Sequence, residues 1–224
     1  MKKSLLSLLF IFSFFLSFAQ ITVLSSFNPS VIGGLCGIGY YPGSSMVWVY
    51  GCSNAEFNSF DTTGVLLSSF PTPGGTANDV DIEIAPLQFL MNGNVVPEGQ
   101  ILFINGESGE AEIYSVDSAT GIIADTLNTV FGSGHVVGGA YHHQRNTFFV
   151  VQDNVPSVQF ENLIAEIDPL NGDTLSTFQI STYFNVSYGD LEVGANGNLF
   201  VVSSLEDSIA EFTPGGLFVQ MHAL

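Results

Sequence analysis

Short apolar segments alternate with turn residues along the chain from about residue 35 to its end. A triplet with an aromatic residue at its centre occurs four times: Val47-Trp48-Val49, Leu102-Phe103-Ile104, Phe148-Phe149-Val150 and Leu199-Phe200-Val201. After each triplet an apolar pair runs into a glycine-containing turn, at 57–61, 113–117, 164–168 and 209–213. Runs of this length between turn residues are typical of β-strands, and no segment beyond the N-terminal region has a helical period. We therefore predict an all-β fold with the four aromatics in its core.

The repeated turns begin at Asp61, Asp117, Asp168 and Thr213, which are 56, 51 and 45 residues apart. This spacing fits one four-stranded antiparallel sheet per repeat, the blade of a β-propeller. We predict about four blades in one domain over residues 20–224, and their bounds are 35–75, 76–132, 136–181 and 186–224. The second is the longest because residues 87–99, rich in Asn, Gly and Pro, are predicted to be a loop inserted between its first two strands. Such insertions often carry binding surface.

The last repeat combines a turn and two strands in a recognisable order. It reads Asp190-Leu191-Glu192-Val193, then Ala195-Asn196-Gly197-Asn198-Leu199-Phe200-Val201, then Ile209-Ala210-Glu211-Phe212. This order resembles the NHL-type blade and the related gluconolactonase and senescence-marker propellers. The resemblance covers most of residues 35–224 in architecture. It implies a propeller fold but no particular function, because propellers carry unrelated chemistries.

The N-terminal part of the predicted domain resembles an additional outer strand. Residues 22–27 nearly repeat residues 65–70, although the four repeats are already complete without them. This strand would either belong to a larger propeller or cover the edge of the first blade. We expect an incomplete part of a larger propeller, since open strand edges are ordinarily covered.

Residues 1–19 have the pattern of a secretory signal peptide. Lys2 and Lys3 precede an apolar run, and Ser17-Phe18-Ala19 places small residues before a cleavage site near Ala19. The product is therefore expected to be secreted or periplasmic. No later stretch is apolar and long enough to predict membrane insertion.

The two cysteines are predicted to form a disulfide, as is usual in an exported chain. Cys36 and Cys52 flank a turn at 42–45, and a hairpin centred on Ser44 places them opposite each other on neighbouring strands.

The charge of the chain restricts its partners. It has 21 acidic residues and three Lys or Arg, with a net charge of −18. Removal of the signal peptide would leave Arg145 alone and bring the charge to −20. Nucleic acids and anionic membranes bind clusters of cationic side chains, so both are excluded as expected partners. Cationic partners and divalent cations are favoured, and solubility in a salty medium is the alternative explanation.

Two predicted inner strands carry pairs of acids at alternate positions. These are Asp81 and Glu83 in the second repeat and Asp190 and Glu192 in the fourth. Residues two apart point to one face of a strand, and inner strands surround the channel of a propeller. Acids from different blades could converge there on calcium, which takes about six to eight oxygen ligands.

The resemblance to the lactonase-type propellers implies a divalent metal in that channel, held by Glu, Asn and Asp of separate blades. This sequence also offers Asn78 and Asp79, but the first and third repeats have only Ile38-Gly39-Tyr40 and Gly139-Ala140-Tyr141 at the matching places. Calcium is thus a candidate cofactor. The alternative is that the acids accept backbone hydrogen bonds or face solvent.

No catalytic residue is predicted. The chain has no Gly-x-Ser-x-Gly sequence and no phosphate-binding loop. Adjacent His142 and His143 would face opposite sides of a strand and are expected in a solvated turn. His135 and His222 have no evident partner.

These observations favour an exported binding or scaffold domain for an unknown protein or small-molecule ligand. The alternative function is a calcium-dependent lactonase or esterase-like hydrolase that uses the inner-strand carboxylates.

Overall fold

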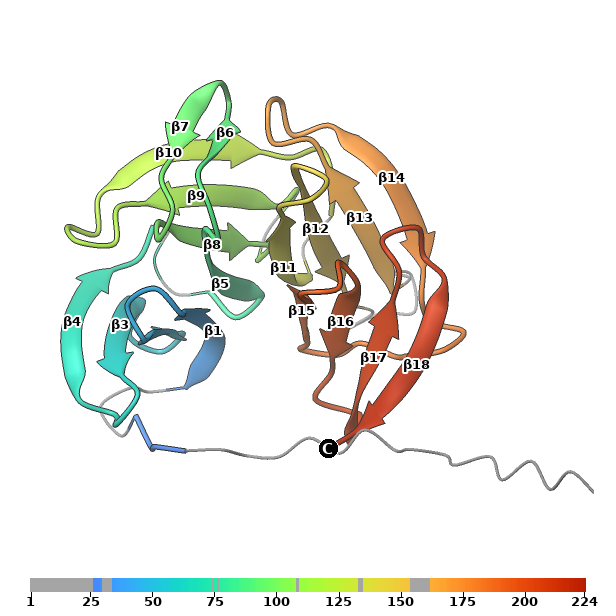
Figure 1. Cartoon of the computed structure of the whole chain (residues 1–224), viewed down its shortest axis with the longest axis horizontal. Coiled ribbons are helices and arrows are strands. Elements are labelled where there is room, and N and C mark those ends of the chain that lie inside the picture. The colour runs from blue at the N-terminus through green and yellow to red at the C-terminus, as the bar shows by residue number, and fades with distance from the viewer. Residues whose placement is uncertain are drawn as a thin grey trace, which may run out of the picture.

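The computed structural model describes residues 26–29, 34–73, 75, 77–107, 109–132, 135–153 and 162–224. Four antiparallel sheets of four strands follow one another as the blades of a β-propeller, which confirms the predicted fold class (Figure 1). Blade 1 consists of β1 (Leu35–Tyr41), β2 (Met46–Gly51), β3 (Glu56–Asp61) and β4 (Leu66–Pro71). Blade 2 consists of β5 (Val80–Ile84), β8 (Ile101–Asn105), β9 (Glu112–Val116) and β10 (Ile123–Asn128).

The second half of the chain forms two further blades of the same topology. Blade 3 consists of β11 (Val136–His142), β12 (Thr147–Gln152), β13 (Leu163–Ile167) and β14 (Thr174–Gln179). Blade 4 consists of β15 (Asp190–Val193), β16 (Leu199–Val202), β17 (Ser208–Phe212) and β18 (Phe218–Ala223). In every blade the strands pair in chain order from the inside outward. The inner strands β1, β5, β11 and β15 face a central channel, and each packs against the next (Figure 1).

The repeated Asp or Thr at the end of the third strand fixes the outer turn of each blade. Asp61 accepts hydrogen bonds from the backbone N–H groups of Thr63 and Val65, at 2.8 and 3.0 Å. Asp117 and Asp168 accept equivalent bonds, and Thr213 Oγ1 accepts one from Leu217 N. A short polar side chain that bonds to the backbone two to four residues later stabilises a turn. The spacing of these residues therefore marks the repeat.

Outer-strand aromatics join blade 1 to blade 2 and blade 3 to blade 4. Phe70 of β4 lies against Gly121 in the turn of blade 2, and Phe178 of β14 lies against Gly216 in the turn of blade 4. Phe27 lies in the same way against Gly64 of blade 1, with its ring 5.6 Å from that of Phe60. Phe27 thus occupies the place that an outer-strand aromatic takes elsewhere. The rest of the predicted N-terminal strand falls outside the described residues, as does the predicted signal peptide.

Apolar side chains between the blades form the core. One cluster joins blades 1 and 2, a second joins blades 2 and 3, and a third joins blades 3 and 4. Trp48, Phe103 and Phe149 are buried as predicted, at 2% exposure or less. Phe200 is only half-buried, and its ring lies 5.6 Å from that of His222 in the same blade.

The insertion in blade 2 is a hairpin, so the prediction of a loop over residues 87–99 was wrong. Strands β6 (Phe89–Met91) and β7 (Asn94–Val96) are joined by Asn92 and Gly93, both with positive φ, at 51° and 82°. Asn-Gly is the sequence that such a two-residue turn prefers, and it could have revealed the hairpin. Phe89 stacks on Tyr141 of blade 3 with ring centroids 3.9 Å apart.

The predicted disulfide between Cys36 and Cys52 is confirmed. It joins β1 to the residue that follows β2, with Cα atoms 5.7 Å apart. No helix among the described residues has the length and apolar character needed to cross a bilayer.

Replacing both cysteines by serine should destabilise blade 1. The crosslink closes a loop of 16 residues, and a loop of about this length contributes roughly 3 kcal/mol in the chain-entropy description. We expect Cys36→Ser/Cys52→Ser to lower the free energy of unfolding by about 2–4 kcal/mol in urea melts. Reduction of the wild-type chain should give a similar loss. An unchanged midpoint in both experiments would contradict this stabilising role.

Candidate binding site in the central channel

The structure brings the four predicted inner-strand acids together as two pairs. Asp81 of β5 and Asp190 of β15 line one cavity, and each of the pairs Asp81–Asp190 and Glu83–Glu192 is close enough for its members to shift each other's pKa. Two carboxyls can share a hydrogen bond only when one of them is protonated. Carboxyls this close to one another favour the protonated form of at least one of them.

Two glycines of β11 explain how strands on either side of it approach so closely. A Cβ atom at Gly138 would lie 2.5 Å from Asp190 Oδ1 and 2.6 Å from Asp190 Cα. The N–H of Gly139 donates to Asp81 Oδ2 at 3.3 Å. Gly138 and Gly139 therefore allow the acids of β5 and β15 to approach each other, although the sequence analysis noted Gly139 only as a position without a metal ligand.

Backbone groups also bind these acids. Asp81 Oδ1 accepts a hydrogen bond from Ile82 N at 2.7 Å, and Asp190 Oδ1 accepts one from Leu191 N at 2.6 Å. The alternative drawn from the sequence, that the acids accept backbone hydrogen bonds, thus describes part of their environment. It does not account for the pairing of the carboxyls.

Burial and mutual repulsion raise the pKa values of these acids and so favour their protonated forms. Burial raises the pKa of Asp81 well above its usual range, and the charge of Asp190 raises it further. Burial raises the pKa of Glu83 to about 7, while the hydrogen bond from Glu192 acts in the opposite direction. Burial and the Glu83 charge raise the pKa of Glu192.

A second acidic cluster lies at one mouth of the channel. His135 Nδ1 lies 3.1 Å from Asp79 Oδ2 and 3.7 Å from Asp153 Oδ1. Asp79 precedes β5, His135 precedes β11 and Asp153 follows β12, so three connections of two blades supply the cluster. The pKa of Asp79 is raised to about 6, chiefly by burial, and the neighbouring His135 opposes this rise.

Sequence reasoning missed this cluster. His135 was expected to have no evident partner, whereas it lies between two carboxylates. Its backbone N–H also donates to Gly106 O of blade 2 at 2.8 Å. Both His135 and Asp79 come directly before an inner strand, and this shared position could have indicated that they lie close together.

Two other histidines also differ from expectation. His142 belongs to β11 and is 1% exposed, and its Nε2 lies 3.0 Å from Gly197 O, so it does not occupy a solvated turn. His222 lies 2.8 Å from Glu211 Oε2 and so has a partner. Both histidines connect strands or blades away from the channel acids.

Two cavities adjoin these groups. One of about 730 Å³ contacts both Asp81 and Asp190 and has apolar walls that include Ile38 and Val49. The other, of about 650 Å³, contacts Asp79 and His135. Leu35, Cys36, Tyr188 and Gly189 border both cavities. The channel acids and the mouth cluster thus open into neighbouring spaces.

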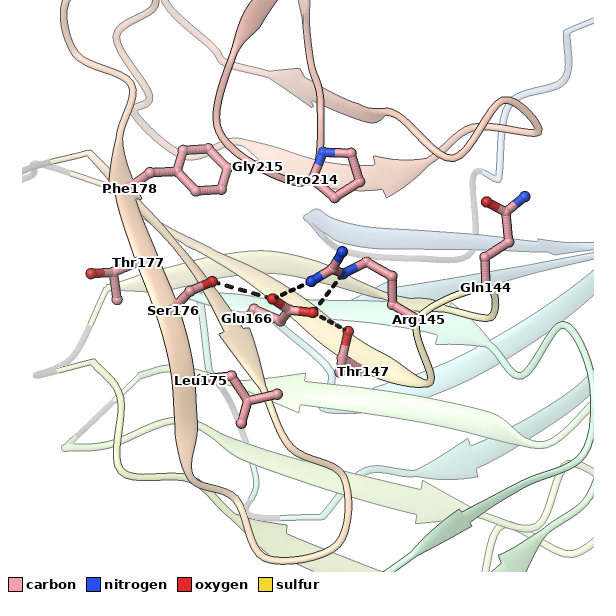
Figure 2. Close-up of a pocket in the computed structure, with 10 residues that line it drawn as sticks. All are labelled: Gln144, Arg145, Thr147, Glu166, Leu175, Ser176, Thr177, Phe178, Pro214 and Gly215. Carbon is pink, nitrogen blue, oxygen red and sulfur yellow. Dashed lines mark hydrogen bonds and ion pairs between the residues drawn. The ribbon is translucent and has the colours of Figure 1, made fainter.

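A third cavity, of about 760 Å³, lies on the outer part of blades 3 and 4 (Figure 2). Arg145 Nε and Nη2 donate to Glu166 at 2.7 and 3.0 Å, and Thr147 and Ser176 donate to the same carboxylate (Figure 2). Because Glu166 is fully bonded, this arrangement is structural. It also engages the guanidinium away from the channel.

No three His, Cys, Asp or Glu side chains in the described parts of the chain are arranged to hold a metal ion. The four channel acids nevertheless lie close enough to influence one another's pKa. Calcium binding by Asp81, Glu83, Asp190 and Glu192 stays a prediction.

Stability should fall as pH rises through the range in which Glu83 ionises. Its pKa in the folded chain, about 7, lies above its ordinary value of 4.5, so the folded state binds the extra proton and loses stability between about pH 4.5 and 7. We expect Glu83→Gln to flatten this decline and to add roughly 1–3 kcal/mol at pH 7.5. Denaturant melts across this range test it, with exposed Glu110→Gln as the control. Parallel curves for wild type and Glu83→Gln would contradict it.

A methyl group at Gly138 should push β15 away from β5. Its Cβ would meet the Asp190 backbone at 2.6 Å, which is too close for any carbon contact. We expect Gly138→Ala to cost about 1–3 kcal/mol as an overpacked substitution. Gly215→Ala is the matched control, because the nearest atom to its Cβ would be 3.8 Å away. Equal thermal midpoints for the two variants would show that this contact does not constrain the channel.

Comparison with solved structures supports the fold. Similar structures include a streptogramin B lyase, with a TM-score of 0.50 and 16% identity over 86% of this chain and 55% of that one. A hydrazine synthase of Kuenenia stuttgartiensis has a TM-score of 0.53 and 13% identity, and the match covers 91% of this chain and 53% of that one. The catalytically inactive H270A virginiamycin B lyase of Staphylococcus aureus with quinupristin has a TM-score of 0.51 and 14% identity, and the match covers 85% of this chain and 70% of that one.

These identities show the propeller fold alone. The chain spans a little over half the length of the streptogramin B lyase and hydrazine synthase chains. No protein-family model and no curated protein matches the sequence. The expected likeness to NHL-type and gluconolactonase propellers therefore holds for the β-propeller architecture and no further.

Proposed function

We propose that this chain is an exported binding domain that takes a positively charged ligand into its central channel. The observation that carries the proposal is the excess of carboxyl groups around the channel. They are Asp79, Asp81, Glu83, Glu107, Asp153, Asp190 and Glu192. Arg145 is the only Lys or Arg after residue 3, and it is paired with Glu166. His135 is thus the single basic side chain among the described residues of this region.

A cation would relieve the main electrostatic cost of this arrangement. Like charges held close together in a buried site raise each other's pKa, as the Asp81–Asp190 and Glu83–Glu192 pairs do. A positively charged ligand can replace protons bound to these acids, so its binding releases protons and strengthens as pH rises. Field lines from acids that line one cleft also concentrate cations there.

Export is supported by two features. The N-terminal residues have the signal-peptide pattern, and the disulfide between Cys36 and Cys52 is compatible with an extracellular or periplasmic location. Calcium is the first cation to test, because hard carboxylate oxygens suit it.

A second candidate function is a calcium-dependent hydrolase. It is favoured by the placement of His135 between Asp79 and Asp153, since a carboxylate-oriented histidine can act as a general base. Hydrolysis of simple lactones and aryl esters, with and without calcium, tests this candidate. Absence of turnover with all of them would reject it.

Cations should stabilise the folded chain through the channel acids. We expect the thermal midpoint, followed by the emission of Trp48, to rise by several degrees with millimolar calcium or with spermidine. A ligand at a hundredfold its Kd contributes about 2.7 kcal/mol. For a chain of this size, 1 kcal/mol shifts the midpoint by roughly 2–4 °C. Sodium chloride at matched ionic strength is the control for screening.

The double variant Asp81→Asn/Asp190→Asn should lose most of this shift, because it keeps the side-chain shapes and removes the charges. Glu110→Gln should keep the full shift. Equal shifts in the double variant and in wild type, or no shift with any cation, would contradict the proposal.

A further inference from the structure

The mouth cluster contains a buried acceptor atom that lacks a donor. Asp79 is 6% exposed, and its Oδ1 has no hydrogen-bond partner. The other oxygen, Oδ2, faces His135 Nδ1 at 3.1 Å. A buried acceptor without a donor costs about 1–3 kcal/mol. Such an atom beside a cavity indicates a group that the cavity receives.

The neighbouring backbone cannot satisfy this oxygen. The N–H groups of Asn78 and Asp79 both donate to Glu107 Oε2, at 2.5 and 3.0 Å. Asp153 accepts a hydrogen bond from Tyr188 N at 3.1 Å through its other oxygen. The nearby N–H groups are therefore directed to carboxylates other than Asp79. No described residue donates to this oxygen, so it is open to a donor that a ligand supplies.

The acidic side chains around Asp79 favour a positively charged donor. Asp79, Glu107 and Asp153 stand against one histidine, so a donor with a positive charge is favoured over a neutral one. A metal ion fits less well, because no three acidic, histidine or cysteine side chains in the described residues are arranged to hold one. An ammonium group supplies both the charge and N–H donors.

The walls of the cavity indicate what the ammonium group is attached to. Leu35 and Tyr188 border both this cavity of about 650 Å³ and the more apolar cavity beside it. Their side chains are 58% and 59% exposed, and Val137 lines the same space. Exposed apolar and aromatic side chains next to a buried acid suit a ligand with a cationic head and an apolar body.

We infer that the channel mouth binds an organic primary or secondary ammonium ion, with its N–H donated to Asp79 Oδ1 and its apolar substituent against Tyr188 and Leu35. This inference rests on the proposed cation-binding function of the channel and names its ligand class. Phenethylamine is a suitable probe. Its uncharged counterpart is 2-phenylethanol, and its trimethylammonium derivative keeps the charge but has no N–H.

Calorimetric titration of the full chain with these three compounds tests the inference. We expect phenethylamine to bind at least tenfold more tightly than either of the others. Asp79→Asn should lower the affinity for phenethylamine tenfold or more, while Asp81→Asn/Asp190→Asn should keep most of this affinity. Tyr188→Ser changes an exposed position and leaves the core intact. It should reduce the affinity for phenethylamine to that for ethylamine.

The outcomes separate this inference from the proposed function. If the trimethylammonium compound binds as tightly as phenethylamine, or if Asp79→Asn binds phenethylamine unchanged in a chain that still melts cooperatively, the ammonium site is wrong. A calcium or spermidine shift that depends on Asp81 and Asp190 would then leave the proposed function standing. If none of the cations binds, both are wrong.

Discussion

The close approach of the inner strands is the constraint on which the rest of this structure depends. Asp190 of β15 lies where any side chain at Gly138 of β11 would have to be, and Asp81 of β5 accepts a hydrogen bond from Gly139 N. Because β11 presents glycine at these two positions, acids from non-adjacent blades meet across the channel. The same approach lets the apolar clusters between blades 2, 3 and 4 close around them.

Burial of several acids in one channel lowers the stability of the fold near neutral pH. The chain has to offset this cost with core packing, with the disulfide of blade 1 and with the side-chain bonds of its outer turns. Natural proteins commonly keep unfavourable arrangements at functional sites and compensate for them elsewhere. The proposed cationic ligand would account for this arrangement of acids.

The mouth cluster and the channel acids line two neighbouring cavities. The paired acids lie within the channel on strands, whereas Asp79, His135 and Asp153 lie on the connections at its mouth. Loops carried by a rigid scaffold are where propellers and other folds place binding groups. His135 and Tyr188 both have positive φ, at 75° and 46°, and such uncommon backbone conformations gather at sites of this kind.

The sequence by itself determined the local features of this protein. Strand periodicity, turn residues and aromatic triplets predicted the four blades, and cysteine spacing predicted the disulfide, because these features depend on neighbours along the chain. Alternate acids on inner strands also indicated that Asp81, Glu83, Asp190 and Glu192 would face the channel. The tertiary structure alone decided which acids pair, that Gly138 permits it, and that His135 lies between Asp79 and Asp153. These contacts join residues up to about a hundred positions apart, and their geometry follows from the packing of blades, which no local pattern records.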